Sequence, residues 1–304
     1  MKEKIILIFL LTAVTIMPCT AGNDTIKVTR TDNKRLGYTL AASAISYAGV
    51  MLLLNEAWYK DYPRSSFHLY NDWGEWKNMD KTGHAFSSYT LSLAGIYLMK
   101  QSGLPDKKAA WAGGLYGPVF LSTIEILDGF SKRWGFSIPD MAANIAGSGL
   151  AVSQELVWGS QIARLKYSYH ESGLAAYRPD ALGKNLPAKM LKDYNGQTHW
   201  ISINIGSLTK NPGRVPSWLS IALGYSADGL LGGFSNPETA NGLQLPELNR
   251  TRQFYISPDI DLSAIDSGSE VVNSILRSFN FLKIPAPALE LNTEGEIKLH
   301  LLFF

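Results

Sequence analysis

Residues 80–84 read DKTGH and residues 140–144 read DMAAN, and these motifs bound the part of the chain that decides the fold, Met79–Gly149. Between them lie three apolar segments rich in Gly, Ala and Ser, whose charged residues fall where a helix is expected to begin or end. Joined by short connections, such segments form an up-down bundle, in which the start of one helix, the end of the next and the start of the third share a layer. The sequence therefore predicts a polar site at one end of a helical bundle.

Seven polar residues of this layer are candidates for binding a ligand. They come from three predicted helices: Asp80, Lys81 and His84, then Glu125 and Asp128, then Asp140 and Asn144. Residues three or four apart share a helix face, so Asp80 with His84, Glu125 with Asp128, and Asp140 with Asn144 each form a pair. The layer therefore presents several carboxylates, an imidazole and an amide toward one point.

The chemistry of these residue types suits several kinds of site. A carboxylate beside a histidine fixes its tautomer, which serves a general base or a metal ligand, and oxygen donors suit a divalent cation. Lys81, with Lys132 and Arg133, could hold a phosphate group. A buried structural network of helix caps and ion pairs would give the same pattern. Catalytic residues and the identity of any metal stay open.

Composition places the chain near a membrane. Of its 304 residues, 18% are charged, below the roughly 25% of an average soluble domain, and 46% are hydrophobic. The net charge of +2 and the lack of a block of basic residues argue against nucleic-acid binding.

Residues 1–21 have the pattern of an export signal. Lys2 and Lys4 precede the apolar run Ile5–Met17, and cleavage is expected after Ala21. The alternative is a lipoprotein signal, cleaved before the only cysteine, Cys19, which would then be acylated. Both predict an exported protein of the cell envelope, associated with the periplasm or the outer membrane, without a disulfide.

The rest of the chain predicts an α+β fold, a membrane-associated antiparallel four-helix bundle over residues 36–160 followed by a smaller β-rich region over 161–304. The uncharged run Leu36–Asn55 is long enough to cross a bilayer. The other three helices are expected over 80–100, 109–127 with a kink at Pro118, and 137–158. Alternating residues predict strands at Trp200–Leu208, Trp218–Tyr225, Phe254–Leu262 and Ile297–Phe303, and helical spacing predicts a helix at Val271–Leu282.

The terminal Phe304 on an alternating strand is typical of outer-membrane barrel proteins. Four strands are too few for a transmembrane barrel, so we interpret this strand as the last one of a small sheet.

The polar layer also resembles known families. The pattern Asp80-Lys81-x-x-His84-Ala-Phe86, Glu125, Ser137-x-x-Asp140-x-x-x-Asn144-x-x-Gly147 is similar to that of VanZ-like membrane proteins. It resembles more closely the YfiM-type family of predicted periplasmic lipoproteins of unknown function, over residues 36–160. Asp128, where a Gln is expected, the export signal and the β-rich tail all depart from the VanZ-like pattern. The resemblance implies a helical envelope protein with a polar site, and it does not transfer glycopeptide resistance.

Three functions follow as hypotheses. The first is a non-catalytic protein that binds a membrane lipid or a cell-wall-related ligand at the polar layer. The second is a hydrolase of phosphorylated lipids that uses His84 as base and a cation bound by carboxylates. The third is a structural partner of outer-membrane proteins, contacted by strand addition to residues 200–304.

Overall fold

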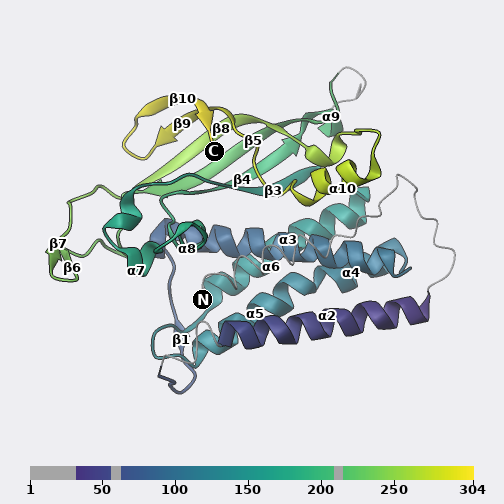
Figure 1. Cartoon of the computed structure of the whole chain (residues 1–304), viewed down its shortest axis with the longest axis horizontal. Coiled ribbons are helices and arrows are strands. Elements are labelled where there is room, and N and C mark those ends of the chain that lie inside the picture. Colours follow the sequence, from purple (N-terminus) through teal and green to yellow (C-terminus); the bar gives the residue numbers. More distant parts are fainter. Residues whose placement is uncertain (1–31, 56–62, 209–214) are drawn as a thin grey trace. The chain divides into compact units, whose positions relative to one another are not determined.

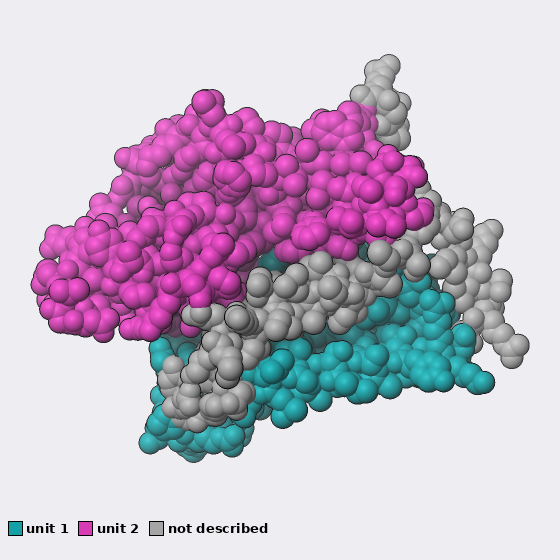
Figure 2. Space-filling model, viewed as in Figure 1, with its two compact units in different colours: residues 1–73, 84–161 teal, residues 74–83, 162–304 magenta. Residues whose placement is uncertain are grey.

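The computed structural model describes residues 32–55, 63–208 and 215–304, which form a mixed helix and sheet fold as predicted (Figure 1). The predicted signal at residues 1–21, including Cys19, lies outside these residues. Two compact units divide the chain: residues 1–73 with 84–161, and residues 74–83 with 162–304 (Figure 2). We call them the helical unit and the sheet unit. The two units are similar in length, whereas the sequence suggested that the β-rich region is the smaller one.

The helical unit is built from helices joined by short turns. They are α2 (Asn33–Leu54), α3 (Met79–Gln101), whose first residues are assigned to the sheet unit, α4 (Asp106–Gly114), α5 (Tyr116–Gly129) and α6 (Ile138–Trp158). The short strands β1 (Leu69–Tyr70) and β2 (Phe136–Ser137) pair in parallel. Helix α6 begins where predicted, because Ser137 Oγ accepts a hydrogen bond of 3.0 Å from the backbone N–H of Asp140.

The third predicted helix is interrupted. It was expected as one helix with a kink at Pro118, but α4 ends at Gly114 and α5 starts at Tyr116. A proline ring clashes with the carbonyl four residues earlier and supplies no N–H, so Pro118 disrupts the helix at Gly114. The interruption therefore lies one turn before the proline.

Helix α2 is the one helix, within the described ranges, that is long and apolar enough to cross a membrane. It has 22 residues and a mean hydropathy of 1.5, and none of its residues is buried. A signal sequence near the N-terminus passes the same test. Two hydrogen bonds of 2.7 Å link α2 to α5, from Tyr116 Oη to Ser43 Oγ and between Tyr47 Oη and Thr123 Oγ1.

Small residues let the other helices approach one another at backbone distance. A Cβ on Gly147 of α6 would lie 2.0 Å from the carbonyl oxygen of Ala85 on α3, and one on Gly113 of α4 would lie 2.2 Å from the backbone N of Ile96. Serine hydroxyls bond across the same contacts, as Ser88 Oγ does to the carbonyl of Asn144 at 2.6 Å. The Gly, Ala and Ser content of the sequence is thus explained by close helix packing.

The sheet unit contains an antiparallel sheet of six strands in the order β10-β9-β8-β5-β4-β3. The strands are β3 (Ala163–Tyr169), β4 (Gln197–Asn204), β5 (Leu219–Asp228), β8 (Thr251–Ile260), β9 (Ala286–Asn292) and β10 (Ile297–Phe303). The hairpin of β6 (Thr239–Ala240) and β7 (Leu243–Gln244) and several short helices complete the unit: η2 (Glu75–Asn78), η3 (Leu174–Ala176), α7 (Pro179–Leu182), α8 (Leu186–Lys192), α9 (Ile205–Leu208), η5 (Leu262–Ala264) and α10 (Glu270–Ser278).

Four of the six strands were predicted, and two were missed. No strand was predicted at β3, where the chain after Arg164 is rich in Tyr, Pro and Gly, or at β9, where Pro285 and Pro287 indicated a break. A proline is tolerated near the start of a strand, and here the carbonyl of Pro287 accepts a hydrogen bond of 2.8 Å from Ser257 Oγ. The last strand, β10, belongs to the sheet as predicted, and it lies at one end of the strand order.

The close contact of α6 with α3 yields a test of the helical unit. Replacing Gly147 by Ala is expected to lower the free energy of unfolding by roughly 1–3 kcal/mol, because the added methyl group displaces the backbone of α3. Gly149 is the matched control, since it lies on the same helix and a Cβ there meets no atom within 4 Å. Gly149→Ala should instead stabilise the helix by roughly 0.5–1 kcal/mol. Denaturant unfolding of both variants checks this, and equal effects would contradict the packing.

Candidate functional site

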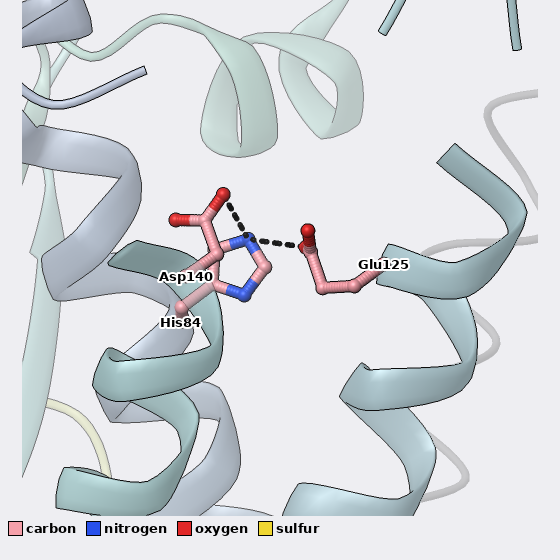
Figure 3. Close-up of side chains that lie close together, drawn as sticks. All are labelled: His84, Glu125 and Asp140. Carbon is pink, nitrogen blue, oxygen red and sulfur yellow. Dashed lines mark ion pairs between the residues drawn. The ribbon is translucent and has the colours of Figure 1, made fainter. Parts of the chain in front are cut away.

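Three side chains from three helices converge in the helical unit: His84 of α3, Glu125 of α5 and Asp140 of α6 (Figure 3). The Nε2 atom of His84 lies 3.7 Å from Glu125 Oε1 and 3.8 Å from Asp140 Oδ2. One nitrogen and two carboxylate oxygens, one from each residue, lie within 4.8 Å of one another. This is the geometry of a group that can share one cation.

The two carboxylates are positioned by the start of α6. Asp140 lies in the first turn of this helix, where the backbone N–H groups and the helix dipole favour a negative charge. The backbone N–H of Ser137 donates to Glu125 Oε2 at 3.1 Å, which ties the end of α5 to the start of α6. The Ser137 hydroxyl donates to Asp72 Oδ1 at 2.7 Å. Ser137 therefore donates to Glu125 through its backbone and to Asp72 through its side chain, and its hydroxyl oxygen accepts from the backbone N–H of Asp140.

The imidazole is oriented by Asn144. The Oδ1 atom of Asn144 lies 3.0 Å from His84 Nδ1, so Nδ1 carries the proton and donates it. The lone pair of Nε2 then points toward Glu125 and Asp140, as a metal ligand requires. Asn144 is itself fixed, because its backbone carbonyl accepts the hydroxyl of Ser88 on α3.

Burial disfavours the ionised form of Glu125. Glu125 is almost fully buried, and its burial raises its pKa to about 8, with Asp140 as the next largest contribution. Asp128 and Asp72 raise the pKa of Glu125 further, and only the hydrogen bond from Ser137 lowers it. Near neutral pH Glu125 therefore keeps a proton that a bound cation would displace.

The hydrogen bonds within the group are incomplete. Both distances from His84 Nε2 to the carboxylates exceed the range of a hydrogen bond. The Nδ2 group of Asn144 is fully buried and, among the described residues, has no hydrogen-bond partner. A network that served stability alone would be closed, because a buried donor without a partner costs roughly 1–3 kcal/mol. The arrangement therefore favours a ligand over a closed structural network.

The structure places the seven predicted residues unequally. It brings together His84, Glu125, Asp140 and Asn144. Asp128 is half-buried on α5 and contributes its charge to the pKa of Glu125 without belonging to the three-ligand group. Asp80 and Lys81 belong to the sheet unit and bond to each other at 2.7 Å.

Three supporting residues were not among the predicted site residues. Ser137 was placed at the start of the predicted helix and was not considered part of the site. Its position three residues before Asp140 was the signal that could have identified it. Ser88 lies one helical turn after His84, on the same face, which was a usable signal. Asp72 lies in the connector before α3, where the sequence has no periodic pattern.

Comparison with known proteins gives one match. Residues 70–155, which include the whole candidate site, match a family described as a predicted periplasmic lipoprotein (DUF2279). No curated protein and no solved structure matches the chain. The description agrees with the predicted exported location in the cell envelope. The resemblance to VanZ-like proteins remains a sequence-based prediction.

The raised pKa of Glu125 predicts how stability depends on pH. The folded-state pKa is about 8 and the usual value is 4.5, so the folded protein binds the extra proton between these values. Stability without a cation should therefore fall as the pH rises from about 4.5 to 8. Glu125→Gln removes this penalty and should stabilise the cation-free protein at pH 9 by on the order of a few kcal/mol, with little effect at pH 4.5.

Thermal unfolding in EDTA across this pH range measures the effect. Glu247→Gln, at an exposed glutamate, is the matched control and should leave the pH profile unchanged. An unfolding profile of Glu125→Gln that parallels the wild type would show that Glu125 is ionised in the folded state.

Proposed function

We propose that the helical unit binds a divalent cation through His84 Nε2, Glu125 and Asp140, and that the cation holds an oxygen-bearing ligand of the cell envelope. The ligand class is the one predicted from the sequence, a lipid or a cell-wall-related molecule, with phosphate or carboxylate as the contacting group. The observation that carries the proposal is the convergence of three ligand atoms from three helices within 4.8 Å.

The ligand set suits a transition metal. One imidazole nitrogen with two carboxylate oxygens is a common set for Zn²⁺, Mn²⁺ or Fe²⁺, whereas Ca²⁺ and Mg²⁺ prefer oxygen ligands alone. Three protein ligands leave at least one coordination position open. The side chain of His84 is 22% exposed, while those of Glu125 and Asp140 are 3% and 8% exposed. The exposed side of the imidazole therefore marks the direction from which a ligand can reach the cation.

A cation would also resolve the electrostatic cost of the site. It stabilises the ionised form of Glu125, so the pKa of that group falls on binding and its proton is released. Asn144 keeps the imidazole in the tautomer that binds metal, and its buried Nδ2 group is available to a second ligand. These two features distinguish the site from an ordinary pair of helix caps.

Membrane association is part of the same proposal. The outer surface of α2 carries large apolar side chains, such as Tyr38, Ile45 and Leu52, each more than 70% exposed. A membrane-associated bundle would cover these side chains with lipid and would present the cation site near the head groups. An envelope ligand that contains phosphate would then be available at high local concentration.

Cation binding can be tested directly by titration calorimetry with Zn²⁺ and Mn²⁺ on the full chain. His84→Ala, Glu125→Gln and Asp140→Asn should each weaken binding at least tenfold, because each removes one ligand. Asn144→Leu should weaken binding about tenfold through loss of imidazole orientation, and Asn144→Asp should retain most of it because an acceptor for Nδ1–H remains. His68→Ala, a histidine of the same unit outside the site, is the control.

Proton release identifies the role of Glu125. Titration at pH 7 in buffers of different ionisation enthalpy should show release of close to one proton per cation, since Glu125 has a pKa of about 8. This release should disappear in Glu125→Gln. Binding that survives in all three ligand variants would place the cation elsewhere and refute the proposal.

Metal-assisted hydrolysis of a phosphorylated lipid is the second candidate, favoured by the open coordination position. In this geometry His84 is a ligand, and not the base predicted from the sequence, because its Nε2 atom faces the carboxylates. A cation-bound water would be the nucleophile, with its pKa lowered by the cation.

The two candidates differ in turnover. Phosphatidate in detergent micelles, incubated with protein and Mn²⁺ or Zn²⁺, should release inorganic phosphate only if the site is catalytic, and Asp140→Asn should abolish the release. Calorimetric binding of phosphatidate to the cation-loaded protein without release of phosphate would instead assign a binding function.

A further inference from the structure

The six-stranded sheet has an inverted distribution of polarity. Its covered face carries polar and charged pairs: Lys166 Nζ lies 2.8 Å from Asp259 Oδ2, both fully buried, and His300 Nε2 lies within hydrogen-bond distance of Glu290 Oε2, at 2.7 Å. The aromatic cluster of Trp200, Tyr255 and Phe303 fills the rest of this face. In a sheet of a water-soluble protein the covered face is apolar and the polar residues face water. Here the charged residues are inside.

The opposite face is apolar across every strand. The register places six aliphatic residues in one row, one from each strand: Leu165, Ile201, Leu223, Ile256, Leu289 and Leu299. The row on one side is Ala163, Ile203, Ile221 and Pro258, and the row on the other side is Tyr167, His199, Tyr225, Phe254, Leu291 and Ile297. None of these rows contains Asp, Glu, Lys or Arg. We call these three rows the apolar band.

Much of the apolar band is exposed. The side chains at its centre, among them Leu223, Ile256 and Leu289, are each about half exposed, at 50%, 48% and 46%. A continuous apolar surface of this extent is unusual on a monomer in water and marks contact with another apolar phase or partner.

The sheet is curled, so the apolar band lies on its convex side. Six flat strands would separate the two edges by about 24 Å. Instead the ring of His170, directly after β3, lies 5.6 Å from the ring of Phe303 on β10. Residues 281–283 add hydrogen bonds beyond β3, from Tyr167 N–H to the carbonyl of Phe281 and from Lys283 N–H to the carbonyl of Tyr167. The polar face is therefore enclosed, and the apolar face surrounds it.

The exposed part of the band is short along the strands. It includes Ile221 and Leu223 on β5 and runs from Phe254 to Pro258 on β8. Four residues separate Phe254 from Pro258, which is about 14 Å along a strand and about 10 Å in height at a tilt of about 40°. A membrane hydrocarbon layer is about 30 Å thick. The band is thus deep enough to enter hydrocarbon and too short to cross it.

We infer that the apolar band of the sheet unit is embedded in the hydrocarbon of a membrane. An apolar convex surface around a polar interior is the lipid-facing arrangement of membrane β-proteins. The row of His199 and Tyr225 is covered within the unit, since Tyr225 packs against Met79 and its hydroxyl donates to the carbonyl of Lys77. A second copy of the chain would cover one side of a convex surface, whereas lipid would cover every exposed part of it. The location in the cell envelope provides the membrane. This inference is independent of the cation site.

Site-specific fluorescence tests the inference on the full chain. Cys19→Ser leaves no other cysteine in the chain, and single cysteines at Leu223, Ile256 and Leu289 can then carry an environment-sensitive dye. Leu243 is the matched control, an exposed leucine of the same unit in the β6–β7 hairpin. The protein is reconstituted in vesicles of phosphatidylethanolamine and phosphatidylglycerol, with or without brominated acyl chains. Quenching by bromine should be at least threefold stronger at the three band positions than at Leu243.

Two results would overturn the inference. Quenching by aqueous iodide at the band positions equal to that at Leu243 would place the band in water. Protection from both iodide and bromine would show that protein covers it. Circular dichroism of each labelled variant verifies the fold.

Discussion

The backbone of helix α6 lies directly against that of helix α3 at Gly147, where the carbonyl of Ala85 occupies the place that a side chain would fill. This contact holds because residue 147 has no side chain, and the hydrogen bond from Ser88 to the carbonyl of Asn144 spans the same contact. One turn before Gly147, the same face of α6 places Asn144 against His84, and a further turn before that it places Asp140. The orientation of the imidazole, the position of the carboxylate and the packing of the unit thus depend on one close helix contact. A site built in this way is rigid, because its residues lie on helices and not on loops.

The electrostatics of the site follow from where these helices end. The last residues of α5 and the first of α6 carry Glu125 and Asp140, and burial together with the mutual repulsion of the carboxylates raises the pKa of Glu125. The start of α6 stabilises Asp140 by its dipole, but a single helix end contributes too little to offset two buried carboxylates. A doubly charged cation offsets them directly. The same residues that make the site costly without a cation are the ones that we propose as its ligands.

Apolar periodicity and helix-terminal charges are local signals, so the sequence predicted the long helices α3 and α6, although it joined α4 and α5 into one. It also grouped His84, Glu125, Asp140 and Asn144, which the structure brings together. The sequence did not predict two strands that depend on contacts between residues far apart in the chain. Strand β3 was not predicted, and its Lys166 is buried against Asp259, a residue more than ninety positions away. Pro287 made β9 look like a break, although only the fold shows that its carbonyl is used by Ser257. Alternation in the strands was recognised correctly, but alternation alone does not say which face is covered, and here the polar face is.

The two units differ in how near a partner their buried charges have. In the sheet unit Asp261 is buried, which alone would raise its pKa, but Arg164 and hydrogen bonds from Ser263 and Asn280 lower it below the usual value. Lys166 lies within ion-pair distance of Asp259, although its burial still lowers its pKa. In the helical unit the pKa of Glu125 is raised, its distance to the imidazole is too long for a hydrogen bond, and the amide of Asn144 beside it has an unused donor. A ligand that bonds to Glu125, His84 and Asn144 would supply the partners that these buried groups lack among the residues that the structure describes.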